Sequence, residues 1–335
     1  MKTLQYISMI VILGTAALFG QTKVGTTAAN FLTVPVGSKA AGMGGAFVAV
    51  ANDATSLFWN VGGISRLERS EFNVSYSDWL VGTNYNWAGL VFRGVDDAFG
   101  ISVNQLDYGD EEITTPEQPN GTGQRWKAQD IALGVSYSRN LTDRFSIGGT
   151  LKYIRQQIWN ESASAFALDV GLLFYTQLPG LKIGMNIANF GTEMKLDGKD
   201  LYQPVDVDPA NTGNNEKITA TLNTDYWTLP LVFTVGLGYD FAVTDDFRFE
   251  VATDAVYPNN HTAYLNLGGE VTWSNMVSLR AGYNSLLKSE EAEEGLNAGV
   301  GFKYDFGSFS ARIDYSYADY KRFKDISKVS LSIGF

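Results

Sequence analysis

The stretch GSKAAGMGGAFVAVANDATSLFWNVGGISRL, from Gly37 to Leu67, is the one long segment after the N-terminus that shows no pattern of strand and turn. It contains two glycine-rich corners, which consist of Gly42, Gly44 and Gly45, and of Asn60, Gly62 and Gly63. Beside these corners stand the apolar side chains Met43, Phe47, Leu57, Phe58 and Trp59. Glycine permits the close approach of one backbone to another. The segment is therefore predicted to be a compact apolar insert that packs against a structure built by the rest of the chain.

Residues 1–20 have the pattern of a secretory signal peptide. Lys2 precedes a short apolar run from Ile7 to Phe19, and polar residues follow from Gln21. The run is shorter than the roughly 20 apolar residues of a membrane-spanning helix. We expect a signal peptide over residues 1–20, an N-terminal segment over residues 21–69 and one further domain over residues 70–335.

The composition indicates an exported, β-rich protein. The chain has 335 residues, no Cys and 13% aromatic residues, and no Pro/Ser-rich linker divides it. Without disulfides, the fold must be held by hydrogen bonds and burial. The formal net charge of −11 argues against a nucleic-acid partner.

From Ser70 onward, apolar side chains stand at every second position in runs of about ten residues, the period of a β-strand. In the run from Phe309 to Tyr317, the intervening positions hold Ser310, Arg312, Asp314 and Ser316. This alternation fits a soluble sandwich with its apolar face inward, and it also fits a membrane barrel with its apolar face outward. The pattern of one strand therefore does not decide between the two.

The number of runs and the lengths of their connections favour the barrel. The runs predict about 14 strands, an even number typical of bacterial barrels. The expected ranges are 70–79, 84–93, 98–108, 127–139, 145–158, 164–176, 181–190, 228–242, 247–257, 262–273, 277–286, 295–305, 308–318 and 325–335. Tight turns such as 94–97 and 306–307 alternate with mostly longer connections such as 109–126 and 191–227. In outer-membrane barrels the short turns face the periplasm.

The sequence thus predicts an all-β fold, a transmembrane antiparallel β-barrel in the outer membrane of a Gram-negative bacterium, with the N- and C-termini in the periplasm. A barrel of this width is not filled by its own wall side chains. The segment Gly37 to Leu67 is therefore predicted to plug the lumen as an N-terminal hatch.

Aromatic residues and the C-terminus are consistent with a barrel in lipid. Trp79, Trp87, Trp126, Trp159 and Trp227 fall near the strand ends that carry the long connections, and Trp273 falls at the opposite end. This placement predicts an aromatic belt mainly on the outer side of the membrane. The chain ends on a strand that finishes in Phe335, which resembles the signal recognised by the barrel assembly machinery.

Three motifs of the N-terminal segment resemble the hatch of the FadL-type outer-membrane barrels. They are Gly37 to Phe47, the triplet Asn52-Asp53-Ala54, and Trp59-Asn60-Val61-Gly62-Gly63. The preceding Thr27 to Leu32 makes the chain similar to the PorV/PorQ branch of that superfamily. The resemblance implies a 14-stranded barrel plugged by its N-terminal segment. Family members usually carry Asn-Pro-Ala-Gly at the second corner, so this chain must shape the turn with two glycines instead.

The resemblance implies one of two functions and does not choose between them. PorV relatives hold secreted cargo at the type IX secretion system, and the loops 109–126 and 191–227 would then grip a secreted partner. FadL relatives pass long-chain fatty acids and other hydrophobic small molecules through the barrel wall. Met43, Phe47, Leu57, Phe58 and Trp59 would then form the apolar path.

Neither catalysis nor a cofactor or metal ion is predicted. The single histidine, His261, stands in a turn without a defined nucleophile or orienting group. Asp206 and Asp208 lack the spacing of a calcium loop, and the acidic run at 290–294 is expected to be solvated. Charges of both signs are expected to point into the lumen and to fix the hatch through salt bridges. They are Lys152, Asp169, Lys182, Arg248, Glu250, Glu270, Arg280, Lys303, Arg312 and Asp314.

Overall fold

The computed structural model describes residues 25–208, 210, 217–288, 295–321, 323 and 325–335. The predicted signal peptide and the acidic run at 290–294 lie outside the described residues. Among the described residues, no α-helix is long and apolar enough to cross a membrane.

The predicted 14-stranded antiparallel barrel is confirmed. Each wall strand pairs antiparallel with its neighbours, and β1 pairs with β19 to close the ring. The wall strands are β1 (Glu71–Asp78), β2 (Asn84–Arg93), β3 (Asp97–Glu112), β4 (Arg125–Thr142), β5 (Phe145–Ile158), β6 (Glu161–Tyr175), β7 (Leu181–Gly191), β13 (Val232–Ala242), β14 (Phe247–Pro258), β15 (Tyr264–Trp273), β16 (Val277–Leu286), β17 (Leu296–Asp305), β18 (Ser310–Ala318) and β19 (Ile326–Gly334).

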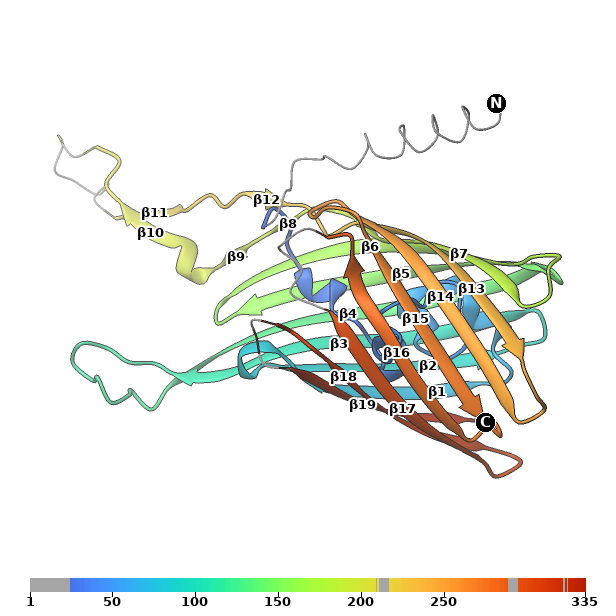
Figure 1. Cartoon of the computed structure of the whole chain (residues 1–335). Helices are drawn as coiled ribbons and strands as arrows, with labels where there is room; N and C mark the ends of the chain where they lie inside the picture. Colours follow the sequence, from blue (N-terminus) through green and yellow to red (C-terminus); the bar gives the residue numbers. More distant parts are fainter. Residues whose placement is uncertain (1–24, 209, 211–216, 289–294, 322, 324) are drawn as a thin grey trace, which may run out of the picture.

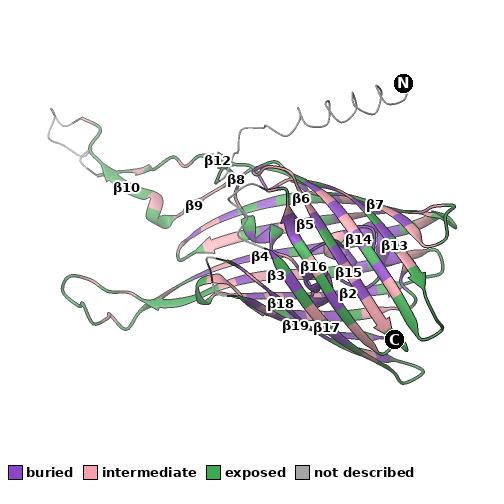
Figure 2. Ribbon diagram, in the orientation of Figure 1, coloured by how far each residue is buried: buried purple, intermediate pink, exposed green. Residues whose placement is uncertain are grey.

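The side-chain alternation of the wall strands places apolar groups outside and polar groups inside. In β19, Leu331 is 42% exposed, whereas its neighbour Ser330 is 2% exposed. The same change from buried to exposed positions repeats along the other wall strands (Figure 2). A soluble sandwich would bury the apolar face instead, so the burial pattern decides for a barrel whose outer face suits lipid.

The two ends of the barrel differ. We call the end with the short turns the near end and the end with the long connections the far end. At the far end, β3 and β4 have 16 and 18 residues and extend as a hairpin beyond the ring (Figure 1). The connection between β7 and β13 carries further short elements there: β8 (Met194–Lys195), β9 (Asp197–Gly198), η4 (Lys199–Leu201), β10 (Tyr202–Val205), β11 (Ile218–Thr221) and β12 (Tyr226–Trp227). The connection between β1 and β2 holds η3 (Leu80–Gly82).

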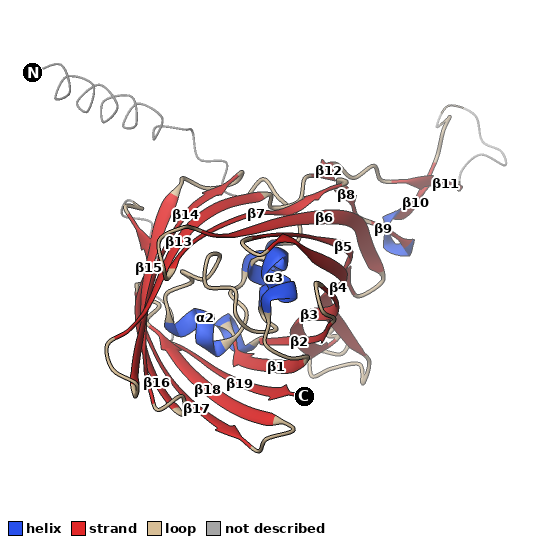
Figure 3. Ribbon diagram, turned by 90° about the vertical axis from the view of Figure 1, so that its right-hand side faces the viewer, coloured by secondary structure: helices blue, strands red, loops and turns tan. Residues whose placement is uncertain are grey.

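The N-terminal residues 27–67, here called the lumenal segment, run through the barrel from the far end to the near end. The segment contains η1 (Asn30–Thr33), α2 (Ser38–Gly42), α3 (Ser56–Trp59) and η2 (Val61–Arg66). Figure 3 shows α2 and α3 inside the ring of strands. Thr27 bridges to Thr228 at the far end, and Arg66 donates to the carbonyls of Thr142 and Asp143 at the near end.

The first described residues and the C-terminus lie at opposite ends of the barrel. The first described residues lie at the far end, where Asn260 donates to Thr27. Phe335 lies at the near end, where its N–H donates to the carbonyl of Ser70. The reason is that the lumenal segment crosses the whole length of the barrel before β1 begins.

The expected aromatic belt needs a correction. Trp87 points into the lumen and is 3% exposed, and Trp79 packs against Tyr85 and Tyr320 rather than lipid. Exposed aromatic pairs are instead frequent at the near end, for example Phe92–Phe335, Phe99–Tyr137 and Phe306–Phe309. Proximity to a strand end therefore did not reveal which face a ring occupies.

Candidate functional site

Three of the corner glycines, Gly42, Gly44 and Gly62, lie where the backbone of the lumenal segment approaches the backbone of the wall. Gly44 adopts a φ of +64°, and a Cβ on it would lie 2.6 Å from the backbone nitrogen of Tyr283. A Cβ on Gly62 would lie 2.7 Å from the carbonyl oxygen of Gly171. The remaining corner glycines make similar approaches: Gly42 to Gly299, Gly45 to the side chain of Asn266, and Gly63 to Ala51 within the segment.

Asn60 fastens the second corner to the wall. Its amide nitrogen donates to the carbonyl oxygens of Val48 (2.7 Å) and Leu172 (2.9 Å), and its Oδ1 accepts from the N–H of Gly62 (3.1 Å). Asn60 is the N-cap of η2, so Val61 occupies the first helical position, where proline is well tolerated. The Asn60 cap therefore holds the turn in this chain without the proline of its relatives.

Ion pairs join the lumenal segment to the wall. Arg312 of β18 pairs with Asp53 of the segment (2.8 Å) and with Asp314 (2.9 Å). Arg280 pairs with both Asp314 and Glu270.

Most of the predicted lumenal charges belong to such buried pairs. Lys152 pairs with Asp169 (2.5 Å), and Lys182 pairs with Glu250 (3.0 Å). Arg248 and Lys303 are not part of buried pairs. Arg248 is exposed, Lys303 is only partly buried, and both lie toward the near end. The network fixes the segment in the lumen, since removing one member of a buried pair leaves an uncompensated charge.

The five predicted apolar residues do not lie along a single surface. Met43 and Phe47 are fully buried in one cluster against Ala252 of the wall. Leu57 belongs to a second cluster that lies against strands β2 and β3. Phe58 and Trp59 line a cavity between the segment and the wall.

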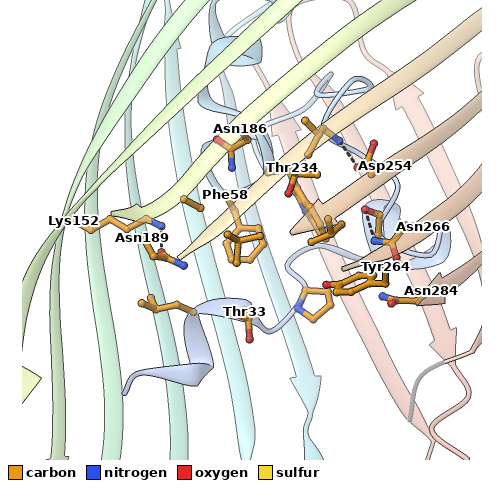
Figure 4. Close-up of a pocket in the computed structure, with 18 residues that line it drawn as sticks. Thr33, Phe58, Lys152, Asn186, Asn189, Thr234, Asp254, Tyr264, Asn266 and Asn284 are labelled. Atoms are coloured by element: carbon orange, nitrogen blue, oxygen red, sulfur yellow. Dashed lines mark hydrogen bonds between the residues drawn. The ribbon is translucent and has the colours of Figure 1, made fainter. Parts of the chain in front are cut away.

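This cavity has a volume of about 90 Å³ and two chemically different sides. Apolar side chains of the lumenal segment, among them Leu32, Val48, Phe58 and Trp59, form one side. The wall strands contribute polar side chains to the other side: Asn186 and Asn189 of β7, Thr234 of β13, Asp254 of β14, Asn266 of β15 and Asn284 of β16 (Figure 4).

Some of the polar wall groups position the segment. Asp254 Oδ2 accepts from the N–H groups of Phe47 (2.8 Å) and Val48 (2.9 Å). Asn266 donates to the carbonyl of Gly45. Asp254 is not among the lumenal charges predicted from the sequence, although it lies on the same strand face as Glu250, two alternations away. The sequence feature that could have identified Asp254 is its position on the inward face of an alternating run.

Solved structures with a similar fold include a hydrocarbon channel and toluene transporters. The fold is similar to that of CymD, a monoaromatic hydrocarbon channel, with a TM-score of 0.59, 13% identity, and coverage of 92% of this chain and 99% of that chain. It is also similar to the toluene transporter TodX of Pseudomonas putida (TM-score 0.53, 12% identity, 94% and 98% covered). The toluene transporter TbuX of Ralstonia pickettii gives a TM-score of 0.53 at 12% identity, with 91% and 98% covered. No curated protein matches the sequence.

The closed antiparallel wall, together with these similarities in fold, defines the class of this protein as a β-barrel. The family model of the type IX secretion system protein PorV matches residues 19–256. The chain belongs to this family.

Proposed function

We propose that this protein is a non-enzymatic component of type IX protein secretion that binds secreted cargo or partner proteins at its far end. In this proposal the near end, with Phe335, faces the periplasm, and lipid covers the outward apolar face. Residues 1–20 act as the signal peptide, and the barrel assembly machinery recognises the final strand. The membership of the PorV family supports the proposal.

The observation that carries the proposal is an apolar surface on a ribbon that lies beyond the ring of wall strands. The ribbon of β10 and β11 projects from the far end, away from the wall (Figure 1). Tyr202 is 50% exposed and Leu222 is 55% exposed, and Val205, Val207 and Ile218 are exposed as well. Because the described part of the chain does not cover these side chains, and the ribbon projects away from the wall, they suit contact with another protein.

The lumen is less suited to hydrocarbon passage. An apolar cavity of about 150 Å³ stays dry and binds benzene, whereas the cavity here measures about 90 Å³ and has a polar side. Apolar molecules would leave the polar wall groups without partners.

The structure suggests a truncation that tests cargo binding. Tyr202 and Thr221 are paired across the ribbon, so residues 203–220 can be replaced by a two-glycine turn. The pairings of β8 with β12 and of β9 with β6 should survive. We expect secreted cargo and type IX components to be lost from the protein purified in mild detergent.

A second truncation provides the matched control. Ile113 and Thr122 are joined at the tip of the β3–β4 hairpin, so residues 114–121 can be shortened in the same way. This tip is polar, TTPEQPNG, and its loss should reduce binding less. Cargo recovery at full strength from the ribbon truncation would refute the proposal.

The second candidate function is a channel for long-chain fatty acids or other hydrophobic small molecules, and the exposure of Phe58 and Trp59 to the cavity favours it. Replacing Phe58 with Asp would place a charge in the path without entering the fully buried cluster of Phe47. Under this hypothesis, liposomes containing the variant should lose uptake of an apolar tracer. Unchanged uptake, or no uptake by the unmodified protein, would exclude the channel.

A further inference from the structure

We propose that the ribbon of β10 and β11 binds its partner by strand addition, in which an extended, positively charged segment of a secreted protein pairs along the outer edge of β11. This inference rests on the proposed cargo binding at the far end, and it names the chemistry of the segment that is bound. It follows from the hydrogen-bonding groups, the apolar face and the charges of the ribbon.

The ribbon is an isolated pair of strands. Among the described strands, β10 and β11 pair only with each other, and Figure 1 shows them apart from the wall. A two-stranded ribbon is at best marginally stable in water, whereas three strands with an apolar face can be stable independently. A third strand would therefore stabilise this ribbon.

The two edges of the ribbon differ. The N–H of Leu222 donates to the carbonyl of Leu201 (2.8 Å). In the antiparallel register, the alternation of hydrogen-bonded pairs then directs the N–H and C=O groups of Thr219 and Thr221 away from β10. Pro204 lies opposite Thr219 and has no N–H to present on the other edge. Because proline protects a sheet edge from pairing, the edge of β10 is blocked and the edge of β11 is open.

The open edge suits another polypeptide backbone. β11 has the sequence Ile-Thr-Ala-Thr, without a proline or a charged side chain that would protect the edge. Its outward N–H and C=O groups alternate at the spacing of an extended chain, and an added strand supplies the complementary groups at the same spacing. Strand addition of this kind is an established mode of peptide recognition.

One face of the ribbon supplies apolar contacts for the added strand. Val205 and Ile218 are directly paired and share this face, and Ala220 follows Ile218 at the second position along β11. Val205 is 41% exposed and Ile218 is 44% exposed. A segment with apolar side chains at every second position would extend this face, since cross-strand pairs stabilise a sheet.

Charge narrows the class of segment further. The described residues of the connection between β7 and β13 carry carboxylates at Glu193, Asp197, Asp200, Asp206, Asp208 and Asp225, and amines at Lys195, Lys199 and Lys217. This excess of negative charge around the ribbon attracts a segment that carries Lys or Arg and repels an acidic one.

The test uses the full-length barrel in mild detergent, and the probe is the protein fraction that its own cells secrete. Thr219→Pro removes an outward N–H from the open edge. We expect the amount of secreted protein retained by the barrel to fall at least about tenfold, because the lost hydrogen bond leaves a carbonyl of the added strand without its partner. Thr219→Val is the matched control, since it keeps the N–H and the shape of the side chain, and it should retain as much as the unmodified barrel.

A second measurement needs no variant. Amide hydrogen exchange of the unmodified barrel is compared with and without the retained secreted protein. An added strand should slow the exchange of the Thr219 and Thr221 amides at least about tenfold, whereas exchange at the β3–β4 tip, residues 114–121, should not change. Added salt should weaken the retention, since it screens the exposed charges.

The outcomes separate strand addition from cargo binding itself. A barrel that retains no secreted protein would refute both. Retention by Thr219→Pro equal to that by Thr219→Val, or unchanged exchange of the β11 amides in a barrel that does retain cargo, would overturn strand addition alone. Slow exchange of these amides without secreted protein, together with a dimer in detergent, would assign the edge to a second copy of the chain. Retention that is unaffected by salt would exclude a positively charged segment.

Discussion

Asn60 connects parts of the lumen that are far apart in the sequence. A single buried amide links Val48, the Gly62 turn and Leu172 of β6, which is 112 residues away. The sequence could identify Asn60 because a glycine-rich corner after an Asn is a local pattern. It could not identify the acceptors, because they are defined by the path of the segment across the barrel.

Replacing Asn60 with Ala should destabilise the fold. The substitution leaves the buried N–H of Gly62 and two carbonyl oxygens without their partner, and each such group costs about 1–3 kcal/mol. We expect a loss of at least about 3 kcal/mol in the free energy of unfolding, measured by urea denaturation in detergent micelles.

Asn223→Ala is the control for that measurement. Asn223 is exposed and accepts one hydrogen bond from Lys195, so the change should stay within about 0.5 kcal/mol. If Asn60→Ala behaved like this control, the amide of Asn60 would not hold the lumenal segment.

At the scale of the elements, strand β5 contains a natural comparison between its two faces. Gly148 faces the lumen, and a Cβ there would lie 2.7 Å from the carbonyl oxygen of Val61 in the lumenal segment. Its neighbour Gly149 faces outward, where the nearest atom to a Cβ is 3.6 Å away. A substitution of Gly148 therefore tests the contact of the strand with the lumenal segment, and a substitution of Gly149 tests the strand alone.

Gly148→Ala should lower stability by about 1–3 kcal/mol, since overpacking forces the segment and the wall apart. Gly149→Ala should leave stability unchanged or raise it slightly, because Ala restricts the unfolded chain. The thermal midpoint of unfolding, followed by the heat-dependent shift of gel mobility, reports both. Equal midpoints for the two variants would contradict the close approach seen at Gly148.

Element boundaries were predictable wherever apolar alternation marks the strand. The ranges 84–93, 145–158 and 277–286 agree with β2, β5 and β16. The alternation underestimated β3 and β4, because their far ends pair through polar residues such as Glu111 with Trp126, outside any apolar medium. β13 begins at Val232 rather than at 228, after Pro230, which lacks the N–H that a strand needs.

For the whole molecule, the sequence predicted the barrel better than the cavity. Strand number and closure follow from a repeated local pattern, and the filling of the lumen follows from the barrel's width. The cavity depends on the docking of Asp254 against Phe47, 207 residues away. No local pattern encodes that distance, so among the lining side chains the sequence singled out only Phe58, Trp59 and Lys152.

The path of the lumenal segment has a consequence for the order in which the chain is made and closed. Ser38 of the lumenal segment contacts Ser330 of β19. The lumenal segment therefore cannot complete its contacts until the last strand has been synthesised. Contacts between such distant residues make folding slow. The N-terminal residues must already lie within the curving sheet when β19 meets β1. We therefore expect the pairing of β19 with β1, which closes the ring, to be the step that encloses the N-terminal residues in the lumen.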